Sequence, residues 1–166
     1  MKLQSGKAVL LAAALILGGA LAAQAAGTST SDDESDTNYD SGVKAVKAAD
    51  YKGARDLFTK VVQKDPKNAD AWNYLGFSDR KLGQFPESLD AYQHALKLQP
   101  NHLGANEYLG ELYVETGKGD MAKAQLAKLE KLCGTACDEY KELNQAITSG
   151  KAAMLDAPQA SNASAN

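Results

Sequence analysis

The chain has 166 residues, with 18 Lys and Arg against 21 Asp and Glu, which gives a formal net charge of −3 at pH 7. It contains no run of basic residues that could condense on phosphates, so its composition argues against nucleic acid and anionic membranes as partners. About 110 residues remain once three predicted segments at the two ends of the chain are set aside, enough for one domain with a modest core.

The first predicted element is a cleavable export signal over residues 1–25. Two lysines precede an uncharged apolar run from Ala8 to Ala23, and Ala23-Gln24-Ala25 supplies small residues at the two positions that a signal peptidase inspects. An uncleaved anchor is disfavoured, because about sixteen apolar residues fall short of the roughly 20 that span a bilayer. We therefore expect a periplasmic protein that begins at Ala26 and has no stable membrane insertion after cleavage.

Two further segments flank the expected domain and lack the apolar residues needed to bury themselves. Residues 26–37 include the sequence TSTSDDESDT, which is dense in acids, and they are predicted to form a disordered linker. Residues 151–166 are rich in Ala, Ser and Asn and are predicted to form a disordered tail. The folded domain is thus expected over residues 38–150.

The sequence of this domain predicts helices that repeat at a fixed interval. Apolar residues recur at helical spacing, and nothing shows the alternation of a strand. The interval from Asp65-Pro66 to Gln99-Pro100 equals the intervals that separate Gly42, Gly76 and Gly110. A fixed period of about 34 residues indicates tandem repeats.

Residues 69–102 resemble a tetratricopeptide repeat. The signature residues at the family's offsets are Trp72, Leu75, Gly76, Tyr92, Ala95 and Pro100. Two positions depart from the pattern, because Asp79 stands where the family usually has Tyr and Ser88 where it usually has Ala. The resemblance implies an all-α solenoid built of helical hairpins.

Weaker copies of the repeat precede and follow this segment. The copy from Leu103 keeps Leu109-Gly110 and Tyr113, whereas the copy from Ser35 is degenerate in its first half. A last amphipathic segment, residues 138–149, starts with a capping residue, Asp138. We expect three hairpins followed by a C-terminal capping helix that covers the third hairpin.

In the family, the first helix of each hairpin lines a concave surface that binds partners. The resemblance places eight candidate partner-binding residues there: Tyr39, Asn73, Phe77, Arg80, Lys81, Glu107, Glu111 and Glu115. The three glutamates are spaced by four residues and form one stripe along a helix. The stripe is either an ordinary solvated face or an acidic wall beside Arg80 and Lys81, selecting a segment with a basic and an apolar residue.

Some family members hold the terminal carboxylate of a partner with paired Lys, Arg and Asn residues on this surface. Asn73 matches that pattern only in part, and Glu107 and Glu111 carry the opposite charge. The resemblance therefore does not carry this activity over, although a protein or peptide partner is still expected.

The pair Cys133 and Cys137 is the only constellation that offers chemistry. A structural disulfide between the third hairpin and the cap, free thiols, and a soft-metal or redox pair all remain open. The spacing is not C-x-x-C, and neither His94 nor His102 lies nearby in sequence, which favours the disulfide.

No catalytic residue, metal site or cofactor is predicted. Neither histidine has a nucleophile or an orienting carboxylate at a motif spacing. The sequence therefore predicts a non-enzymatic adaptor in the bacterial periplasm or envelope. The alternative is a thiol-dependent copper or redox accessory factor that uses Cys133 and Cys137.

Overall fold

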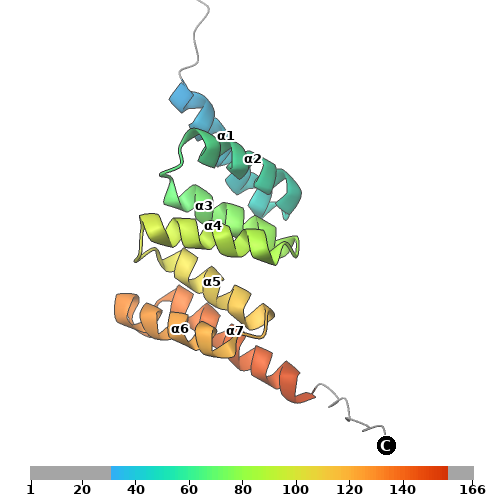
Figure 1. Ribbon diagram of the computed structural model, residues 1–166, viewed down its shortest axis with the longest axis vertical. Coiled ribbons are helices and arrows are strands. Elements are labelled where there is room, and N and C mark those ends of the chain that lie inside the picture. Colours follow the sequence, from blue (N-terminus) through green and yellow to red (C-terminus); the bar gives the residue numbers. More distant parts are fainter. Residues whose placement is uncertain (1–30, 157–166) are drawn as a thin grey trace, which may run out of the picture.

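The computed structural model describes residues 31–156, which form seven α-helices and contain no strand (Figure 1). In chain order the helices are α1 Ser31–Lys47, α2 Tyr51–Lys64, α3 Ala69–Lys81, α4 Phe85–Leu98, α5 Leu103–Glu115, α6 Gly119–Cys133 and α7 Asp138–Asp156. The first six pair into three hairpins that stack along one axis, and α7 lies at the far end of the stack. The predicted all-α solenoid of three hairpins with a capping helix is confirmed.

Both ends of the helical array extend beyond the expected domain. Helix α1 begins at Ser31, so residues 31–37 are helical where the sequence favoured a disordered linker. Helix α7 continues to Asp156, past the expected boundary at residue 150. Extending a helix that is already packed costs little, because each added residue gains a backbone hydrogen bond without a new nucleation step.

The predicted export signal, residues 1–25, lies outside the described residues, and so does the last part of the predicted tail, residues 157–166. Within residues 31–156, no helix combines the length and the apolar character that a membrane span requires.

Local sequence signals set where several helices begin. The side chains of Asp50, Asn68 and His102 cap α2, α3 and α5, each accepting a hydrogen bond from the backbone N–H three residues on. The three distances are 2.9, 2.9 and 3.1 Å. Each cap satisfies one of the N–H groups that a helix start leaves unpaired. His102 therefore has a structural role at the start of α5.

The two helices of a hairpin approach closely where a glycine removes the side chain. A Cβ atom placed on Gly76 of α3 would lie 2.8 Å from the ring of Tyr92, a completely buried residue of α4. Gly42 faces the ring of Phe58 at the same short distance in the first hairpin. The constant spacing of these glycines along the chain thus reflects a packing contact that recurs from hairpin to hairpin.

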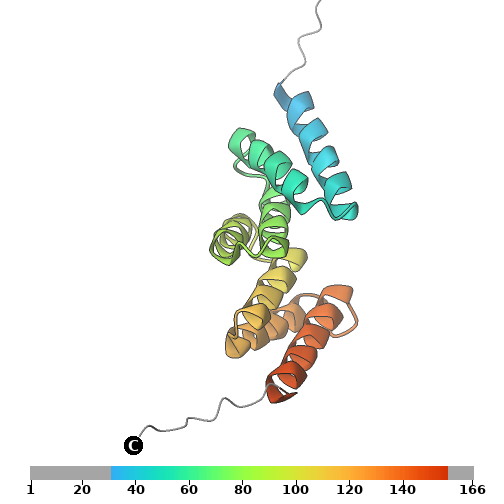
Figure 2. The same cartoon turned by 90° about the vertical axis from the view of Figure 1, so that its right-hand side faces the viewer.

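Helix α7 is an integral part of the third hairpin's core. It packs against both α5 and α6, and it lies beside α5 in Figure 2. The fully buried side chain of Leu143, from α7, fills the space in front of Gly110. At Gly76 the corresponding space is filled by Tyr92 from α4, the partner helix in that glycine's own hairpin. Ile147 joins the same cluster and is 8% exposed. The cap therefore covers apolar surface that the third hairpin cannot bury alone.

Candidate partner-binding face

The eight predicted binding residues lie on the first helices of the hairpins, and we call the surface they mark the first-helix face. Tyr39 belongs to α1, four residues belong to α3, and the three glutamates belong to α5. Tyr39 and Phe77 are half-buried and Lys81 is exposed, whereas Asn73 and Arg80 are only 5% and 4% exposed. The structure therefore leaves part of the predicted set open to a partner and encloses the rest.

Aromatic rings connect the three first helices across this face. The ring of Phe77 on α3 lies 5.0 Å from that of Tyr108 on α5, and the ring of Tyr39 on α1 lies 6.0 Å from that of Tyr74 on α3. Such tilted and edge-on pairs are favourable beyond the area they bury. Tyr74 and Tyr108 were not among the predicted residues. They stand at the same position of two successive repeats, so a tyrosine recurs there, and this recurrence could have indicated them.

Arg80 is the centre of a buried ion-pair cluster. Its guanidinium nitrogens lie 2.5 Å from a carboxylate oxygen of Glu111 and 2.5 Å from one of Glu115. The same group lies 5.5 Å from the centroid of the Phe77 ring and 5.7 Å from that of Tyr108, within the range of a cation–π interaction. With 2% of its side chain exposed, Arg80 joins α3 to α5 and is not available to a partner.

This cluster changes the charge pattern that the sequence suggested. Burial lowers the pKa of Arg80, but Tyr92, Glu111 and Glu115 raise it more, so the guanidinium stays charged. Arg80 pairs with two glutamates of α5 and offsets one of their two negative charges, so an internal ion cluster replaces the expected opposition of a basic patch and an acidic wall. Lys81 is the candidate cation that stays exposed, and its Nζ lies 5.3 Å from the centroid of the Phe77 ring.

Glu107 does not belong to an exposed acidic stripe. It is 3% exposed, and its Oε1 atom has no hydrogen-bond partner among the described residues. Burial raises the pKa of Glu107 to about 9, assisted by a hydrogen bond to Glu142 and by the charges of Glu142, Glu111 and Glu139. The Glu107 carboxyl is therefore neutral at pH 7 and contacts the capping helix. It does not form one charged stripe with Glu111 and Glu115.

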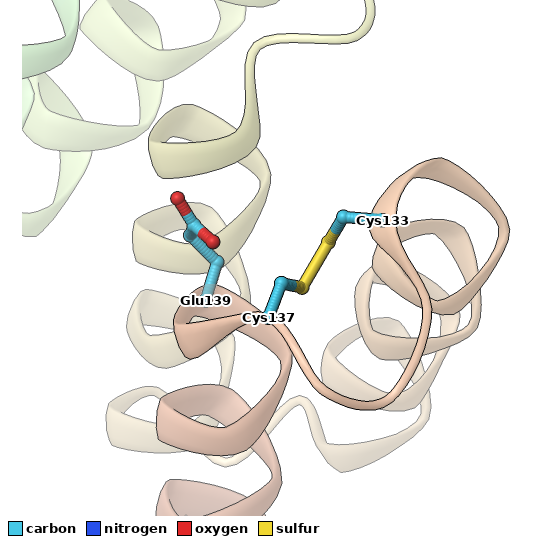
Figure 3. Close-up of side chains that lie close together, drawn as sticks. All are labelled: Cys133, Cys137 and Glu139. Atoms are coloured by element: carbon cyan, nitrogen blue, oxygen red, sulfur yellow. A yellow bond between two sulfur atoms is a disulfide. The ribbon is translucent and has the colours of Figure 1, made fainter.

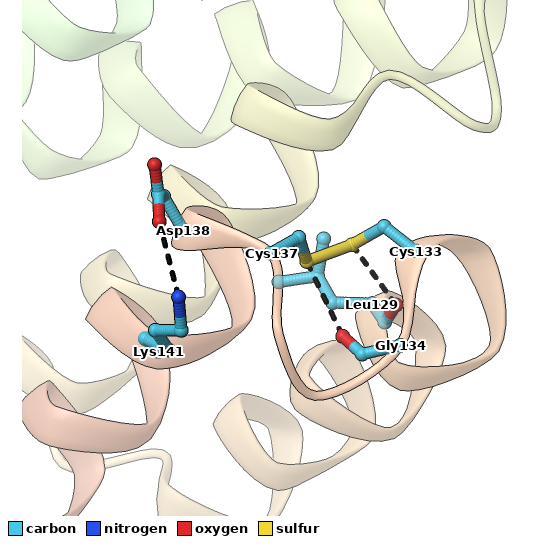
Figure 4. The surroundings of a disulfide bond; sticks show 6 residues. All are labelled: Leu129, Cys133, Gly134, Cys137, Asp138 and Lys141. Carbon is cyan, nitrogen blue, oxygen red and sulfur yellow. Dashed lines mark hydrogen bonds and ion pairs between the residues drawn. A yellow bond between two sulfur atoms is a disulfide. The ribbon is translucent and has the colours of Figure 1, made fainter.

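The two cysteines occupy the turn from α6 to α7. Their Sγ atoms are 2.09 Å apart, the length of a disulfide bond, and their Cα atoms are 5.9 Å apart (Figure 3). Each sulfur also lies 3.3 Å from a backbone carbonyl oxygen, Cys133 from that of Leu129 and Cys137 from that of Gly134 (Figure 4). This geometry ties the end of the third hairpin to the cap.

A carboxylate lies close to the cysteine pair. One ligand atom of Glu139 and both sulfurs lie within 4.8 Å of one another, and residues 36–150 contain no other cluster of three such potential metal ligands. Cysteine binds a metal ion as the thiolate, so this pair can form a disulfide or hold an ion, but not both at once. His94 and His102 are engaged elsewhere, His94 stacked on Trp72 at 4.5 Å and His102 capping α5.

Stacked hairpins whose first helices share one face define a helical-repeat protein of the α-solenoid class. Two family models, both described as tetratricopeptide repeat, match residues 69–102 and 39–76. The chain is a tetratricopeptide repeat protein.

Several curated proteins are similar over part of their length. Protein FlbA of Caulobacter vibrioides is 33% identical over 129 residues, which is 71% of this chain and 22% of that protein. The PEX5-related protein of Homo sapiens is 30% identical over 79 residues, which is 48% of this chain and 13% of that protein. The chain thus spans less than a quarter of the length of these relatives.

Solved structures show the same fold. The first TPR of Spaghetti (RPAP3), bound to the HSP90 peptide SRMEEVD, superposes with a TM-score of 0.64 at 20% identity, over 72% of this chain and 94% of that one. The Yersinia enterocolitica type III secretion chaperone SycD, in complex with a peptide of the translocator YopD, gives 0.60 at 18% identity, over 72% and 91%. At these identities the likeness concerns the fold alone.

Proposed function

We propose that this chain is a non-enzymatic adaptor that holds a peptide or protein segment on its first-helix face. The observation that carries the proposal is the exposure of aromatic surface at Phe77 beside the exposed ammonium group of Lys81, with a second half-buried ring, Tyr39, on α1. Half-buried aromatic rings are the usual anchors of protein recognition, because they offer a large apolar contact at a low cost in conformational entropy. Spaghetti and SycD, which share the fold, hold peptides in their solved structures.

The exposed charge next to Phe77, that of Lys81, favours an apolar residue next to an acidic one in the bound segment. Arg80 is held by Glu111 and Glu115, so it contributes no free positive charge. Lys81 and Lys47 are exposed on the ends of α3 and α1. An acidic partner residue near Lys81 gains modest affinity and faster association, while the apolar residue on Phe77 supplies the anchor.

Selection from a displayed peptide library tests this function directly. We expect the library to yield binders with an apolar–acidic pair, whose affinity falls about tenfold or more in Phe77→Ala. Lys81→Ala is expected to have a smaller effect and to flatten the dependence of binding on salt. Glu130→Gln, an exposed change on α6, is the matched control. Peptides that bind Phe77→Ala as tightly as the native chain would place the binding surface elsewhere.

We further propose that the protein works in the bacterial periplasm or envelope after cleavage behind Ala25. The proposal is supported by the charge, length and small-residue pattern of residues 1–25. Intact-mass measurement on protein isolated from the bacterial envelope tests it. A mature chain that begins at Ala26 supports export, and a chain that keeps Met1 to Ala25 overturns the proposed cleavage.

In that compartment the cysteine pair is proposed to be oxidised, because the periplasm favours disulfides and the two Cα atoms lie within the range that a disulfide bridges. We expect changing both Cys133 and Cys137 to Ser to lower the free energy of unfolding by about 2 kcal/mol, the value for closing so short a loop. Urea denaturation measures it. Dithiothreitol should reproduce the loss in the native chain and leave the double variant unchanged.

The alternative function, a thiol-dependent copper or redox factor, makes the opposite prediction for the same variant. If the cysteines only brace the turn, the double change to Ser leaves peptide binding within about twofold, because neither cysteine belongs to α1, α3 or α5, the helices that carry the first-helix face. Loss of a copper-binding or thiol-exchange activity in the variant, with peptide binding absent in the native chain, would support the alternative.

A further inference from the structure

A hollow lies on the side of the array formed by the second helices of the first two hairpins. It has a volume of about 340 Å³ and is bounded by α2, α3 and α4. Its apolar part includes Leu75 and the indole of Trp72, and its polar part includes Asp79, Glu87 and Asp90. Residues of the first-helix face do not line it, so it is separate from the proposed peptide site.

Asp79 is the unusual group in this hollow. It is 5% exposed, and no described residue donates a hydrogen bond to its carboxylate or lies within ion-pair distance of it. Burial raises its pKa to about 6, while the nearby charge of Arg55 lowers it and that of Glu87 raises it. Because this largely buried, unpaired carboxylate lines the hollow, it can accept hydrogen bonds from a donor that enters there.

Arg55 borders the hollow but does not satisfy Asp79. Its Nε and one terminal nitrogen lie 3.3 and 3.0 Å from a carboxylate oxygen of Asp56, and its other terminal nitrogen donates to Gln84 at 3.0 Å. Arg55 shares the carboxylate of Asp56 with Lys52, whose Nζ lies 3.3 Å from it, so Arg55 keeps part of its positive charge at the edge of the hollow. Three carboxylates line the hollow, those of Asp79, Glu87 and Asp90, and they outnumber the single cation Arg55, so the hollow is negative.

The repeat supplies an internal comparison. A hollow of about 320 Å³ lies at the equivalent place in the next repeat, and its lining residues Leu89, Tyr113 and Lys118 occupy the repeat positions of Arg55, Asp79 and Gln84. That second hollow has no carboxylate in its lining. The acidic chemistry is thus a property of the first hollow and not of the fold.

The shape of the acidic hollow selects among cations. Its carboxylates do not converge on a point, since the one cluster of three potential metal ligands in residues 36–150 is at Cys133, Cys137 and Glu139. A divalent ion needs several oxygens at one centre. A long side chain with a cationic end fits better, because its methylene groups can pack on Trp72 and Leu75 while its charge reaches Asp79.

We propose that this hollow is a second protein-docking site that takes a Lys or Arg side chain of a partner, with Asp79 binding the cationic end and Trp72 covering the aliphatic stem. The chain then contacts partners on two faces, the first-helix face and this acidic hollow. The two sites differ in the partner charge that they favour, because the open charge of the first-helix face is Lys81.

Small cations test the site directly on the full chain. Trp72 is the only tryptophan, so its indole N–H signal in a ¹H–¹⁵N spectrum is assigned without ambiguity. The N–H donates to the Pro66 carbonyl at 3.0 Å, and the signal reports on the hollow because the indole lines it. n-Butylammonium and n-butylguanidinium at pH 7.5, where Asp79 is ionised, are expected to shift this signal saturably, and n-butanol is not. Asp79→Asn keeps the shape, removes the charge, and is expected to raise the dissociation constant about fivefold or more.

Two comparisons keep the result specific. Glu130→Gln removes an exposed carboxylate elsewhere and is expected to leave the titration unchanged, while signals of Tyr113 in the equivalent hollow do not respond to the cations. Equal shifts with n-butanol, equal affinity in Asp79→Asn, or a matching response at Tyr113 would each overturn the proposal. Peptide binding on the first-helix face is measured separately with Phe77→Ala, so the two sites succeed or fail independently.

Discussion

Replacing Glu107 by Gln is expected to raise the free energy of unfolding at pH 7 by about 3 kcal/mol. The pKa of this buried carboxyl is about 9 in the folded chain and about 4.5 when it is exposed, so folding at pH 7 requires it to take up a proton. Gln is neutral at every pH and has nearly the same shape. The substitution thus removes the cost of protonation and keeps a donor for Glu142.

The pH dependence has a definite sign. A carboxyl whose pKa is raised on folding contributes full stability below about pH 4.5 and progressively less as the pH rises toward 9. The groups that face Glu107 are Glu142 and Glu139 from α7 and Glu111 on its own helix. Native protein should therefore lose stability across this window, and Glu107→Gln should lose much less.

Urea denaturation at pH 4.5, 7 and 8.5 measures the difference between the two proteins. We expect them to be similar at pH 4.5 and to diverge as the pH rises. The exposed change Glu130→Gln controls for the loss of a negative charge in general. A constant difference at all three values would show that Glu107 does not take up a proton on folding.

The repeat register could be predicted from the sequence because it depends on contacts within one hairpin. Gly76 and Tyr92 must meet for α3 and α4 to pack, and both residue types stand at fixed offsets that the constant period reveals. The same offsets predicted which residues stand on the first helices of the hairpins. The offsets did not predict which of these side chains are exposed and which are buried or ion-paired.

Contacts between hairpins and with the cap could not be predicted in the same way. Arg80 reaches Glu111 and Glu115 on the next first helix, and whether a long side chain does so depends on the angle between α3 and α5. Glu107 is enclosed because α7 folds back along α5, and no repeat offset encodes that position. The departure of Asp79 from the family pattern was visible in the sequence, but only the structure shows the hollow it lines.

Replacing Arg80 by Ala is expected to lower the free energy of unfolding by about 3 kcal/mol. The change removes the guanidinium from between the rings of Phe77 and Tyr108 and leaves two carboxylates on α5 without their partner. The Glu111 side chain is 21% exposed and that of Glu115 is 40% exposed, so the pair with Glu115 is screened by water and most of the loss comes from Glu111 and the lost packing.

A double-mutant cycle separates these contributions. Because Arg80 and Glu111 lie in contact, we expect their coupling energy to be about 1–2 kcal/mol, and the coupling of Arg80 with Glu115 to be about 0.5 kcal/mol or less. Arg80→Lys keeps the charge but loses the planar two-pronged geometry, so it is expected to recover less than half of the stability. If Arg80→Ala changes stability by less than about 0.5 kcal/mol, or couples equally to an exposed glutamate such as Glu130, the buried cluster does not hold α3 to α5. Arg80 would then be free to meet a partner, and the charge pattern of the first-helix face would return to a basic patch beside an acidic wall.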